Sequence, residues 1–227
     1  MIGTQLGHYR IERLLGTGGM GEVYLADDAK LGRRVALKVL SSTLANDPDR
    51  RERFEREARA AAALNHPNIV TIHSVETIDG VPFITLELVD GETLADLIPA
   101  EGLPLDRVLT LGIPLADAVG AAHQRGITHR DLKPANVMVT DDTGTVKIMD
   151  FGIARVLGGE HFTHAGFMMG TPAYMAPEQV LGQDVDGRAD LYSVGVLFYR
   201  LLSRELPFQA DTAIHPPATT TVPTAAR

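Results

Sequence analysis

The sequence predicts an α+β fold of two lobes, in which a β-rich amino-terminal lobe with one helix precedes a mainly helical carboxyl-terminal lobe. Short apolar runs typical of strands fill most of residues 9–89, and longer helical patterns begin at residue 90. We therefore expect the first lobe at residues 9–89 and the second at residues 90–209. Residues 210–227 are rich in Thr, Ala and Pro, which predicts a flexible tail.

The composition argues against several classes of partner and of functional site. The 227 residues carry a formal net charge of −8, which argues against a nucleic-acid partner. The absence of cysteine excludes disulfides, thiolate zinc sites and thiol catalysis. Residues 161–177 lack Asp, Glu, Lys and Arg, but they are too short and too rich in Gly, Pro and His to span a bilayer. With no signal-peptide pattern in residues 1–9, we expect a cytoplasmic protein with no membrane segment in this chain.

The first lobe combines strands with one helix. The helix runs from Pro48 to Leu64, because an aspartate at the N-cap, Asp47, followed by proline is a strong helix start. Asn65 and Pro67 end it. The predicted strands are Tyr9–Leu15, Glu22–Ala26, Val35–Leu40, Ile69–Val75 and Phe83–Leu88.

The second lobe contains two long predicted helices and a hairpin. The first helix spans Leu105–Gln124, and Pro114 inside it predicts a kink. The hairpin pairs Asn136–Thr140 with Thr145–Met149 through a turn of Asp, Thr and Gly. The helix Gly187–Ser203 is apolar on nearly all sides, so we expect it to be buried.

A glycine cluster separates the first two strands. Residues 16–23 read G-x-G-x-x-G-x-V, and glycines let backbone amides approach phosphate oxygens without obstruction by side chains. An ordinary glycine turn is the alternative. A dinucleotide-binding fold is disfavoured, because a helix should follow the glycines in that fold, whereas a strand is predicted here.

Lys38 lies in the third predicted strand, in the sequence Val-Ala-Leu-Lys. Strand alternation places Ala36 and Lys38 on one face, which suits a small lid over a nucleotide base beside a phosphate contact. A solvent-facing lysine is the alternative.

Glu57 lies inside an apolar stripe of the predicted helix. The stripe contains Phe54, Ala61 and Leu64, and a charge among apolar residues needs a partner. Lys38 is the natural candidate. The alternative is a surface glutamate paired with an arginine of its own helix.

Three further motifs carry groups suited to phosphate chemistry. Residues 129–136 read His-Arg-Asp-Leu-Lys-Pro-Ala-Asn, in which Asp131, Lys133 and Asn136 could position a hydroxyl, a phosphate and a metal ion. Asp-Phe-Gly follows the hairpin at residues 150–152, where a carboxylate at a strand end can hold Mg²⁺. Ala-Pro-Glu stands at residues 176–178. Asp-Phe-Gly or Ala-Pro-Glu alone would be uninformative, so the evidence is the order and spacing of these motifs.

Taken in order, these motifs resemble those of the eukaryotic-type protein kinases over residues 8–208. The wording of residues 64–70 and 90–94 is most similar to the bacterial serine/threonine protein kinases, and Lys133 resembles the lysine of serine/threonine rather than tyrosine enzymes. The resemblance implies a two-lobed protein-kinase-like fold. It also implies transfer of the γ-phosphoryl group of ATP to Ser/Thr hydroxyls of protein substrates.

The resemblance assigns the phosphate chemistry to four side chains. Lys38 would contact the α- and β-phosphates and pair with Glu57. Asp131 would accept the proton of the substrate hydroxyl, and Lys133 would neutralise the γ-phosphate.

The resemblance also implies how the metal and the nucleotide would be held. Asn136 and Asp150 would hold Mg²⁺, with Mn²⁺ as the alternative. The residues that would contact the nucleotide are Gly16, Thr17, Gly18, Gly19, Met20, Gly21, Val23, Ala36, Lys38 and Met138, together with the backbone of Glu87 and Val89 between the lobes.

Autophosphorylation is a further implication of the resemblance. Arg130 would grip a phosphate on the loop after Asp150. Thr163 is the best candidate site, because Thr171 matches the threonine that contacts Asp131 and Lys133. Asp190 matches an aspartate that braces the backbone of the loop containing Asp131, with a favourable charge at a helix start as the alternative.

The resemblance weakens after Phe208. The stretch that follows is rich in Pro and Thr, so the second lobe is expected to lack the last helices of the family. Either the gene product is short or the chain is a fragment of a longer receptor-like kinase. We expect self-association or a partner over the uncovered face. Two other functions stay open: a truncated pseudokinase or nucleotide-binding regulatory partner without activity, and a small-molecule phosphotransferase.

Overall fold

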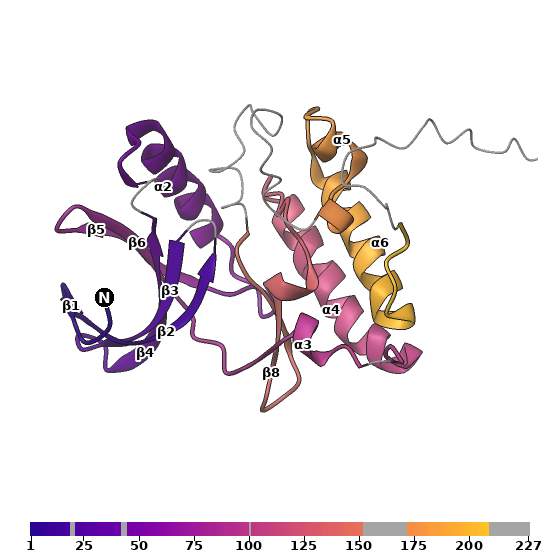
Figure 1. Ribbon diagram of the computed structural model, residues 1–227, viewed down its shortest axis with the longest axis horizontal. Helices are drawn as coiled ribbons and strands as arrows, with labels where there is room; N and C mark the ends of the chain where they lie inside the picture. The colour runs from indigo at the N-terminus through magenta and orange to yellow at the C-terminus, as the bar shows by residue number, and fades with distance from the viewer. Residues whose placement is uncertain (19–20, 42–44, 100, 152–171, 209–227) are drawn as a thin grey trace, which may run out of the picture.

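The computed structural model describes residues 1–18, 21–41, 45–99, 101–151 and 172–208. It has two lobes, a sheet lobe with one long helix and a helical lobe (Figure 1). The predicted α+β fold of two lobes is thereby confirmed.

The sheet lobe is built on six antiparallel strands in the order β1-β2-β3-β4-β6-β5. All five predicted strands form, and the short β1 at the edge was not predicted. The strands are β1 (Gln5–Leu6), β2 (Tyr9–Gly18), β3 (Gly21–Asp28), β4 (Arg33–Leu40), β5 (Ile72–Ile78) and β6 (Val81–Leu86).

The start of β5 differs from the prediction for a physical reason. The strand was expected from Ile69, but Ile69 forms a parallel bridge with Ile148 of the other lobe. The N–H of Val70 donates to the carbonyl of Ile148 over 2.9 Å, and the N–H of Ile148 donates to Asn68 over 2.8 Å. These backbone bonds join the two lobes, and the alternation of the sequence cannot reveal which partner a strand end will choose.

The two faces of β4 serve different purposes, as alternation predicts. Val35, Leu37 and Val39 pack into a core inside the curled sheet, together with Tyr24 and Phe83. The opposite face carries Ala36 and Lys38. Lys38 is only 7% exposed, so it is not the solvent-facing lysine of the alternative interpretation.

Helix α2 (Pro48–Ala62) forms where it was predicted and ends two residues before the predicted Leu64. The side chain of Asp47 accepts hydrogen bonds from the N–H groups of Asp49 and Arg50, and Pro48 occupies the first turn. Phe54, with other apolar residues of this helix, packs against the sheet.

The helical lobe contains the two predicted long helices, α4 (Leu105–His123) and α6 (Gly187–Ser203). The predicted hairpin forms as β8 (Val137–Thr140) and β9 (Val146–Ile148). The short elements were not predicted: β7 (Gly91–Thr93), α3 (Leu94–Leu97), α5 (Pro177–Val180) and the 3₁₀ turns η1 (Pro134–Asn136) and η3 (Pro172–Tyr174).

Helices α4 and α6 lie side by side in this lobe (Figure 1) and share its core. Gly112 allows the close approach, because a Cβ there would lie 2.5 Å from the ring of Phe198. Helix α4 runs through Pro114 without interruption.

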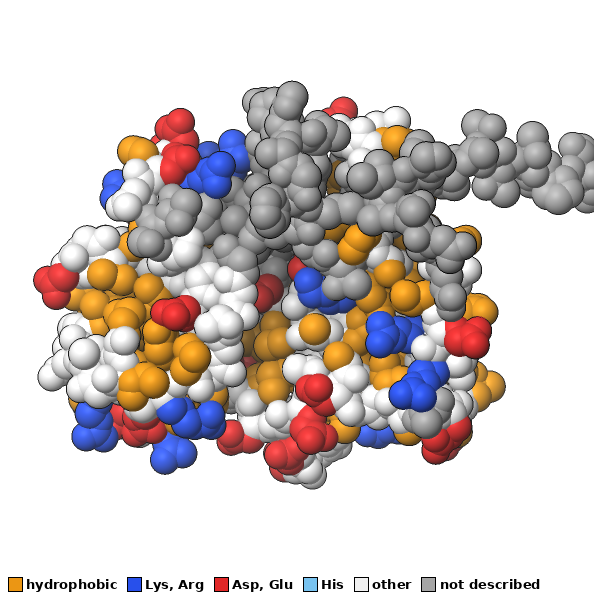
Figure 2. Space-filling view, in the orientation of Figure 1, with side chains coloured by type: hydrophobic (Ala, Val, Ile, Leu, Met, Phe, Trp, Pro, Cys, Tyr) orange, Lys and Arg blue, Asp and Glu red, His pale blue; other side chains and the backbone are white. Residues whose placement is uncertain are grey.

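Burial of α6 is one-sided, which corrects the expectation of a helix buried all round. Leu197 and Leu201 are fully buried, whereas Leu191, Tyr199 and Leu202 are exposed. Figure 2 shows hydrophobic side chains at the surface on the side of the molecule that α6 occupies. Within the described ranges, no helix is both long and apolar enough to cross a membrane.

Candidate active site

An ion pair joins the two lobes. Lys38 of β4 places its Nζ 2.7 Å from Oδ1 of Asp150, which follows β9 in the other lobe. A buried lysine requires a matched negative charge, because an uncompensated buried charge is strongly destabilising. Asp150 therefore supplies a negative charge for Lys38, a partnership that the sequence did not indicate.

Glu57 occupies the predicted apolar stripe of α2. Both of its carboxylate oxygens are shielded from solvent, so it is not a surface glutamate. Lys38 makes its ion pair with Asp150, and the expected pairing of Lys38 with Glu57 stays a prediction.

Asp150 is held in its ionised form. Burial alone would raise its pKa, but the charge and hydrogen bond of Lys38, with the charges of His129 and Lys133, hold the pKa below its ordinary value. Its backbone φ is +60°, in the left-handed region that is unfavourable for a residue with a side chain. Strain of this kind persists only where the surrounding structure enforces it, and it concentrates at functional sites.

A second group of charged and polar side chains lies in the loop of residues 129–136, called the catalytic loop below. Nζ of Lys133 lies 2.7 Å from Oδ2 of Asp131. The amide Nδ2 of Asn136 donates to the backbone carbonyl of Asp131 over 2.6 Å and to its Oδ2 over 3.1 Å. Lys133 and Asn136, which the sequence singled out, therefore both contact Asp131.

Asp190 of α6 braces this loop from below. It is fully buried, and its carboxylate accepts the N–H groups of His129 and Arg130 over 2.8 Å each. Nε2 of His123 lies 2.7 Å from the same carboxylate. These contacts support a bracing role, since a charge that merely complements the start of a helix would not need three partners elsewhere.

His129 connects the loop to the segment of Asp150, a role that the sequence analysis did not assign. The ring is fully buried, and Nε2 lies 2.8 Å from the carbonyl oxygen of Met149. Its edge packs on Phe151 with centroids 4.8 Å apart. The available signal was the residue type itself, because a histidine that becomes buried must find partners for both ring nitrogens.

The glycine loop has two kinds of glycine. Gly21 has a φ of +144°, and a Cβ there would lie 1.9 Å from the carbonyl oxygen of Val39, so close packing on β4 requires glycine. At Gly16 and Gly18 a Cβ would meet nothing within 4 Å. That open space is compatible with backbone approach to a ligand. Gly19 and Met20 lie outside the described residues.

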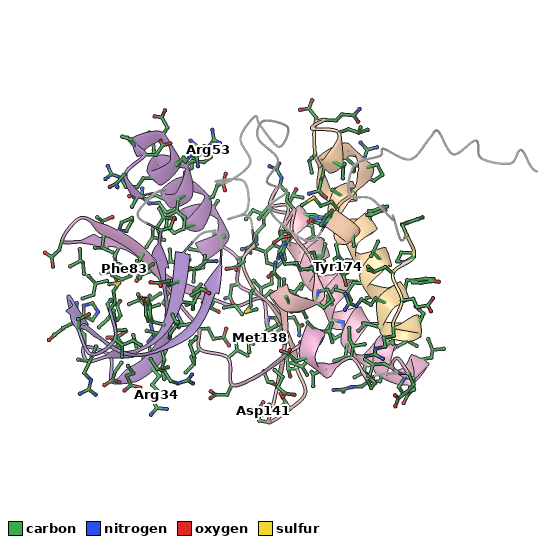
Figure 3. All side chains as sticks on the ribbon, viewed as in Figure 1. Arg34, Arg53, Phe83, Met138, Asp141 and Tyr174 are labelled. Carbon is green, nitrogen blue, oxygen red and sulfur yellow. The ribbon has the colours of Figure 1, made fainter. Side chains whose placement is uncertain are left out.

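The face of β4 that carries Lys38 also carries the residues expected around a nucleotide base. In the antiparallel register, Val23 lies opposite Lys38, and Ala36 lies opposite Leu86 of β6. Met138 of β8 lies between the sheet lobe and the helical lobe (Figure 3). An apolar surface on both sides of the junction suits a flat aromatic base.

The link between the lobes runs from β6 to β7 and contains Glu87 and Val89. The carboxylate of Glu87 accepts the N–H of Thr71 over 3.1 Å and contacts Nζ of Lys147 at 2.5 Å. Glu87 thus ties the link to both lobes through its side chain. For Glu87 only a backbone role was predicted, and for Lys147 none.

The residues expected to hold a metal offer oxygen atoms. The described residues contain no group of three or more His, Cys, Asp or Glu side chains arranged to hold a metal ion. Because Nδ2 of Asn136 donates to Asp131, the amide oxygen is the atom that could face a cation. With the carboxylate of Asp150, this makes two oxygen ligands. Such a set fits Mg²⁺, which usually takes one or two protein ligands and completes its shell with phosphates and water.

The segment of residues 172–180 packs on α6 beside the catalytic loop. Tyr174 lies next to α6 (Figure 3), and its carbonyl accepts a hydrogen bond from Oγ of Ser193 over 2.7 Å. The guanidinium of Arg200 stacks over its ring at 5.9 Å from the centroid. The predicted phosphorylation site Thr163, as well as Gly152 and Thr171, lies outside the described residues.

Comparison with known proteins places these features in a family. The family described as "protein kinase domain" matches residues 9–221. The chain is 46% identical over 218 residues to the serine/threonine-protein kinase Pkn1 of Myxococcus xanthus, covering 93% of this chain and 31% of that protein. It is 44% identical over 217 residues to the serine/threonine-protein kinase PknA of Mycobacterium tuberculosis, covering 93% and 50%. The chain thus spans half or less of the length of these relatives.

Solved structures agree with the sequence comparison. The crystal structure of the Mycobacterium tuberculosis PknI kinase domain matches with a TM-score of 0.73 and 38% identity, covering 94% of this chain and 82% of that one. The fold, the order of the motifs and the matched range of residues 9–221 all indicate the same family. This chain belongs to the protein kinase domain family.

Proposed function

We propose that the chain transfers the γ-phosphoryl group of ATP to serine and threonine hydroxyls of proteins. The observation that carries the proposal is the Lys38–Asp150 ion pair across the two lobes, together with the contacts among Asp131, Lys133 and Asn136. The names of the relatives, which are serine/threonine-protein kinases, agree with it.

In this proposal the nucleotide lies at the junction of the lobes. The base packs between the Val23 and Ala36 side and Met138, and it bonds to the backbone of Glu87 and Val89. The backbone of the glycine loop and the ammonium of Lys38 contact the phosphates. Asn136 and Asp150 hold Mg²⁺, or Mn²⁺ in its place, which supplies charge neutralisation on the phosphate oxygens when bound.

The transfer step uses Asp131 and Lys133. The substrate hydroxyl oxygen forms a bond to the γ-phosphorus while the bond from that phosphorus to the bridging oxygen of ADP breaks. Asp131 orients the hydroxyl and accepts its proton, and Lys133 offsets negative charge on the transferring group. The 2.7 Å contact between Lys133 and Asp131 brings the proton acceptor and the cation together.

Two alternatives differ in what they predict. A nucleotide-binding regulatory partner would bind ATP without transferring phosphate, although both catalytic side chains are present here. A small-molecule phosphotransferase would not need the segment of residues 172–180. In our proposal this segment binds the peptide substrate, and the contacts of Tyr174 with Ser193 and Arg200 hold it against α6.

The test is phosphorylation of a generic basic protein with Mg·ATP by the full chain and by two variants, Asp131→Asn and Lys38→Met. Each variant should lose at least about a hundredfold in rate, because groups acting at the transferring phosphate contribute several kcal/mol to the transition state. Lys30→Met, at an exposed turn of the sheet lobe, is the matched control and should keep full activity.

The outcomes separate the alternatives. ATP binding by the wild-type chain without transfer to any protein would favour the regulatory partner. A Lys38→Met variant with undiminished transfer would remove Lys38 from the site. In the same reaction, mass spectrometry of residues 155–175 should find phosphate on Thr163 in the wild type and none in Asp131→Asn.

A further inference from the structure

The backbone that carries Asp131 is strained. Arg130 has a φ of +69°, although it is not glycine. A side chain in the left-handed region costs roughly 1–2 kcal/mol, so the conformation requires contacts that enforce it. The position of Asp131 depends directly on those contacts, because Asp131 is the next residue.

Side chains hold the peptide groups on both sides of Arg130. On the amino side, the buried carboxylate of Asp190 accepts the N–H of Arg130 over 2.8 Å. On the carboxyl side, the carbonyl oxygen of Arg130 accepts a hydrogen bond from Nε2 of Gln179 over 2.7 Å. The N–H of the same peptide group, that of Asp131, donates to Nδ1 of His129 over 3.2 Å. The orientation of the 130–131 peptide is thereby set from both of its ends.

Gln179 makes a second contact with its other amide atom. Its Oε1 accepts the N–H of Ala176 over 3.0 Å. The two bonds fix the amide orientation without ambiguity, because a carbonyl can only accept and a backbone N–H can only donate. Gln179 lies in α5, at the end of the segment that includes Tyr174. One side chain therefore bridges the catalytic loop and the segment of residues 172–180.

We propose that Gln179 is a positioning residue that couples the catalytic loop to the peptide-binding segment. It holds the carbonyl of Arg130 and the N–H of Ala176 in one amide and so sets where Asp131 lies relative to the bound hydroxyl. The inference rests on the proposed function and deepens it, because the reaction then depends on the position of the segment of residues 172–180. The primary amide of glutamine carries its donor and its acceptor on separate atoms, and the same group of asparagine is one carbon shorter in reach.

Two substitutions separate the two contacts. Gln179→Glu keeps the size and the acceptor for Ala176 but loses the donor to Arg130, and it places a carboxylate against a carbonyl oxygen. Gln179→Leu loses both contacts. Gln183→Glu is the matched control, since Gln183 is exposed four positions further along.

The kinetic arm measures peptide phosphorylation at saturating Mg·ATP. Gln179→Glu should lower kcat at least tenfold, equivalent to about 1.4 kcal/mol, with the KM for ATP within twofold of wild type. Its melting temperature should stay within about 3 °C. Gln179→Leu should lose at least as much kcat and also raise the KM for the peptide, whereas Gln183→Glu should match the wild type. Equal kcat in all four proteins would overturn the proposal.

A second arm does not depend on activity. Amide hydrogen exchange should quicken in peptides covering 128–136 for both Gln179 variants, and in peptides covering 172–180 for Gln179→Leu alone. Unchanged exchange in both regions would remove the bridge even if the wild-type chain proved inactive. A wild type without transfer, but with these exchange changes, would instead count against the proposed function and keep the bridge.

Discussion

The charged residues of the site find their partners in distant parts of the chain. Lys38 and Asp150 are 112 positions apart, and the carboxylate of Asp190 accepts the backbone N–H of Arg130 from 60 positions away. Removal of one partner from a buried pair is destabilising by roughly 3–5 kcal/mol, because the other charge is left uncompensated. Arg130 and Asp150 add strained backbone at φ values of +69° and +60°. Strained backbone of this kind concentrates at functional sites, which agrees with the function proposed for these residues.

The Lys38–Asp150 pair predicts a pH dependence of stability. The pKa of Asp150 is lowered in the folded protein, because the neighbouring cations outweigh burial. A carboxyl group of this kind stabilises the fold above its unfolded pKa of about 3.9, and that contribution is lost as the pH falls through the lower folded value. The wild type should therefore be more stable to urea than Asp150→Asn at pH 7, and the difference should shrink as the pH falls below about 4.

Urea midpoints at several pH values between 3 and 7 provide the measurement. Asp141→Asn is a useful control, since residue 141 is exposed and distant from Lys38 in the sequence. A gap between the wild type and Asp150→Asn that stays constant over the whole pH range would contradict the prediction.

At the scale of elements, α4 shows how packing overrides local preference. Pro114 removes a backbone donor inside the helix, and Gly112 has the lowest helix propensity after proline. The helix nevertheless extends over 19 residues. Leu111 and Leu115 on either side of these breakers are buried in the core that α4 shares with α6. Tertiary burial of the apolar face therefore maintains the helix.

Pro114→Ala is expected to stabilise the protein. The substitution restores the N–H that bonds to the preceding turn and removes the ring from its carbonyl, against a smaller gain in the entropy of the unfolded chain. A net gain of about 1–2 kcal/mol should raise the melting temperature by roughly 3–6 °C. Gly120→Ala in the same helix should add up to about 1 kcal/mol, because its Cβ would meet nothing within 4 Å. A lower melting temperature for Pro114→Ala would mean that the proline ring is itself a packing contact.

At the scale of the whole molecule, several kinds of contact join the lobes. The pairing of Ile69 with Ile148, the bonds of Glu87 and the Lys38–Asp150 ion pair all cross the junction. Apolar packing crosses it as well, because Ala61 and Leu64 of the first lobe belong to the core of the helical lobe.

The helical lobe presents an apolar surface that should promote self-association. Leu105, Leu109 and Ile113 are spaced by four along α4 and are 60%, 47% and 65% exposed. Leu191 and Leu202 of α6 are also exposed. Contiguous apolar surface beyond a few hundred Å² usually marks an interaction site or causes aggregation. We expect the purified 227-residue chain to associate in a concentration-dependent way.

Sedimentation velocity and light scattering measure this association. Ile113→Glu combined with Leu109→Glu should shift the population toward monomer. Leu31→Glu, at an equally exposed leucine of the sheet lobe, should leave it unchanged. A monodisperse wild-type monomer that melts cooperatively at ordinary mesophile temperatures would contradict the prediction.

Local patterns in the sequence were sufficient for the long elements, and they singled out residues that the fold brings together. Period-two alternation in Val35–Leu40 and the cap at Asp47 specify β4 and α2, because side-chain direction and capping are set within a few residues. The order of the motifs located Lys38, Asp131 and Asp150 before any contact was known.

Tertiary structure decided the partners. Lys38 pairs with Asp150, a partner that the sequence did not indicate, and Gln179 reaches Arg130 across 49 positions. The burial of only one side of α6 is likewise set by its neighbours. Short elements such as α3 and α5 contain four residues each, too few for a periodic signal. The physical reason is common to all of these cases: a residue's sequence sets which interactions it can make, but the choice among partners depends on the distances that only the folded chain establishes.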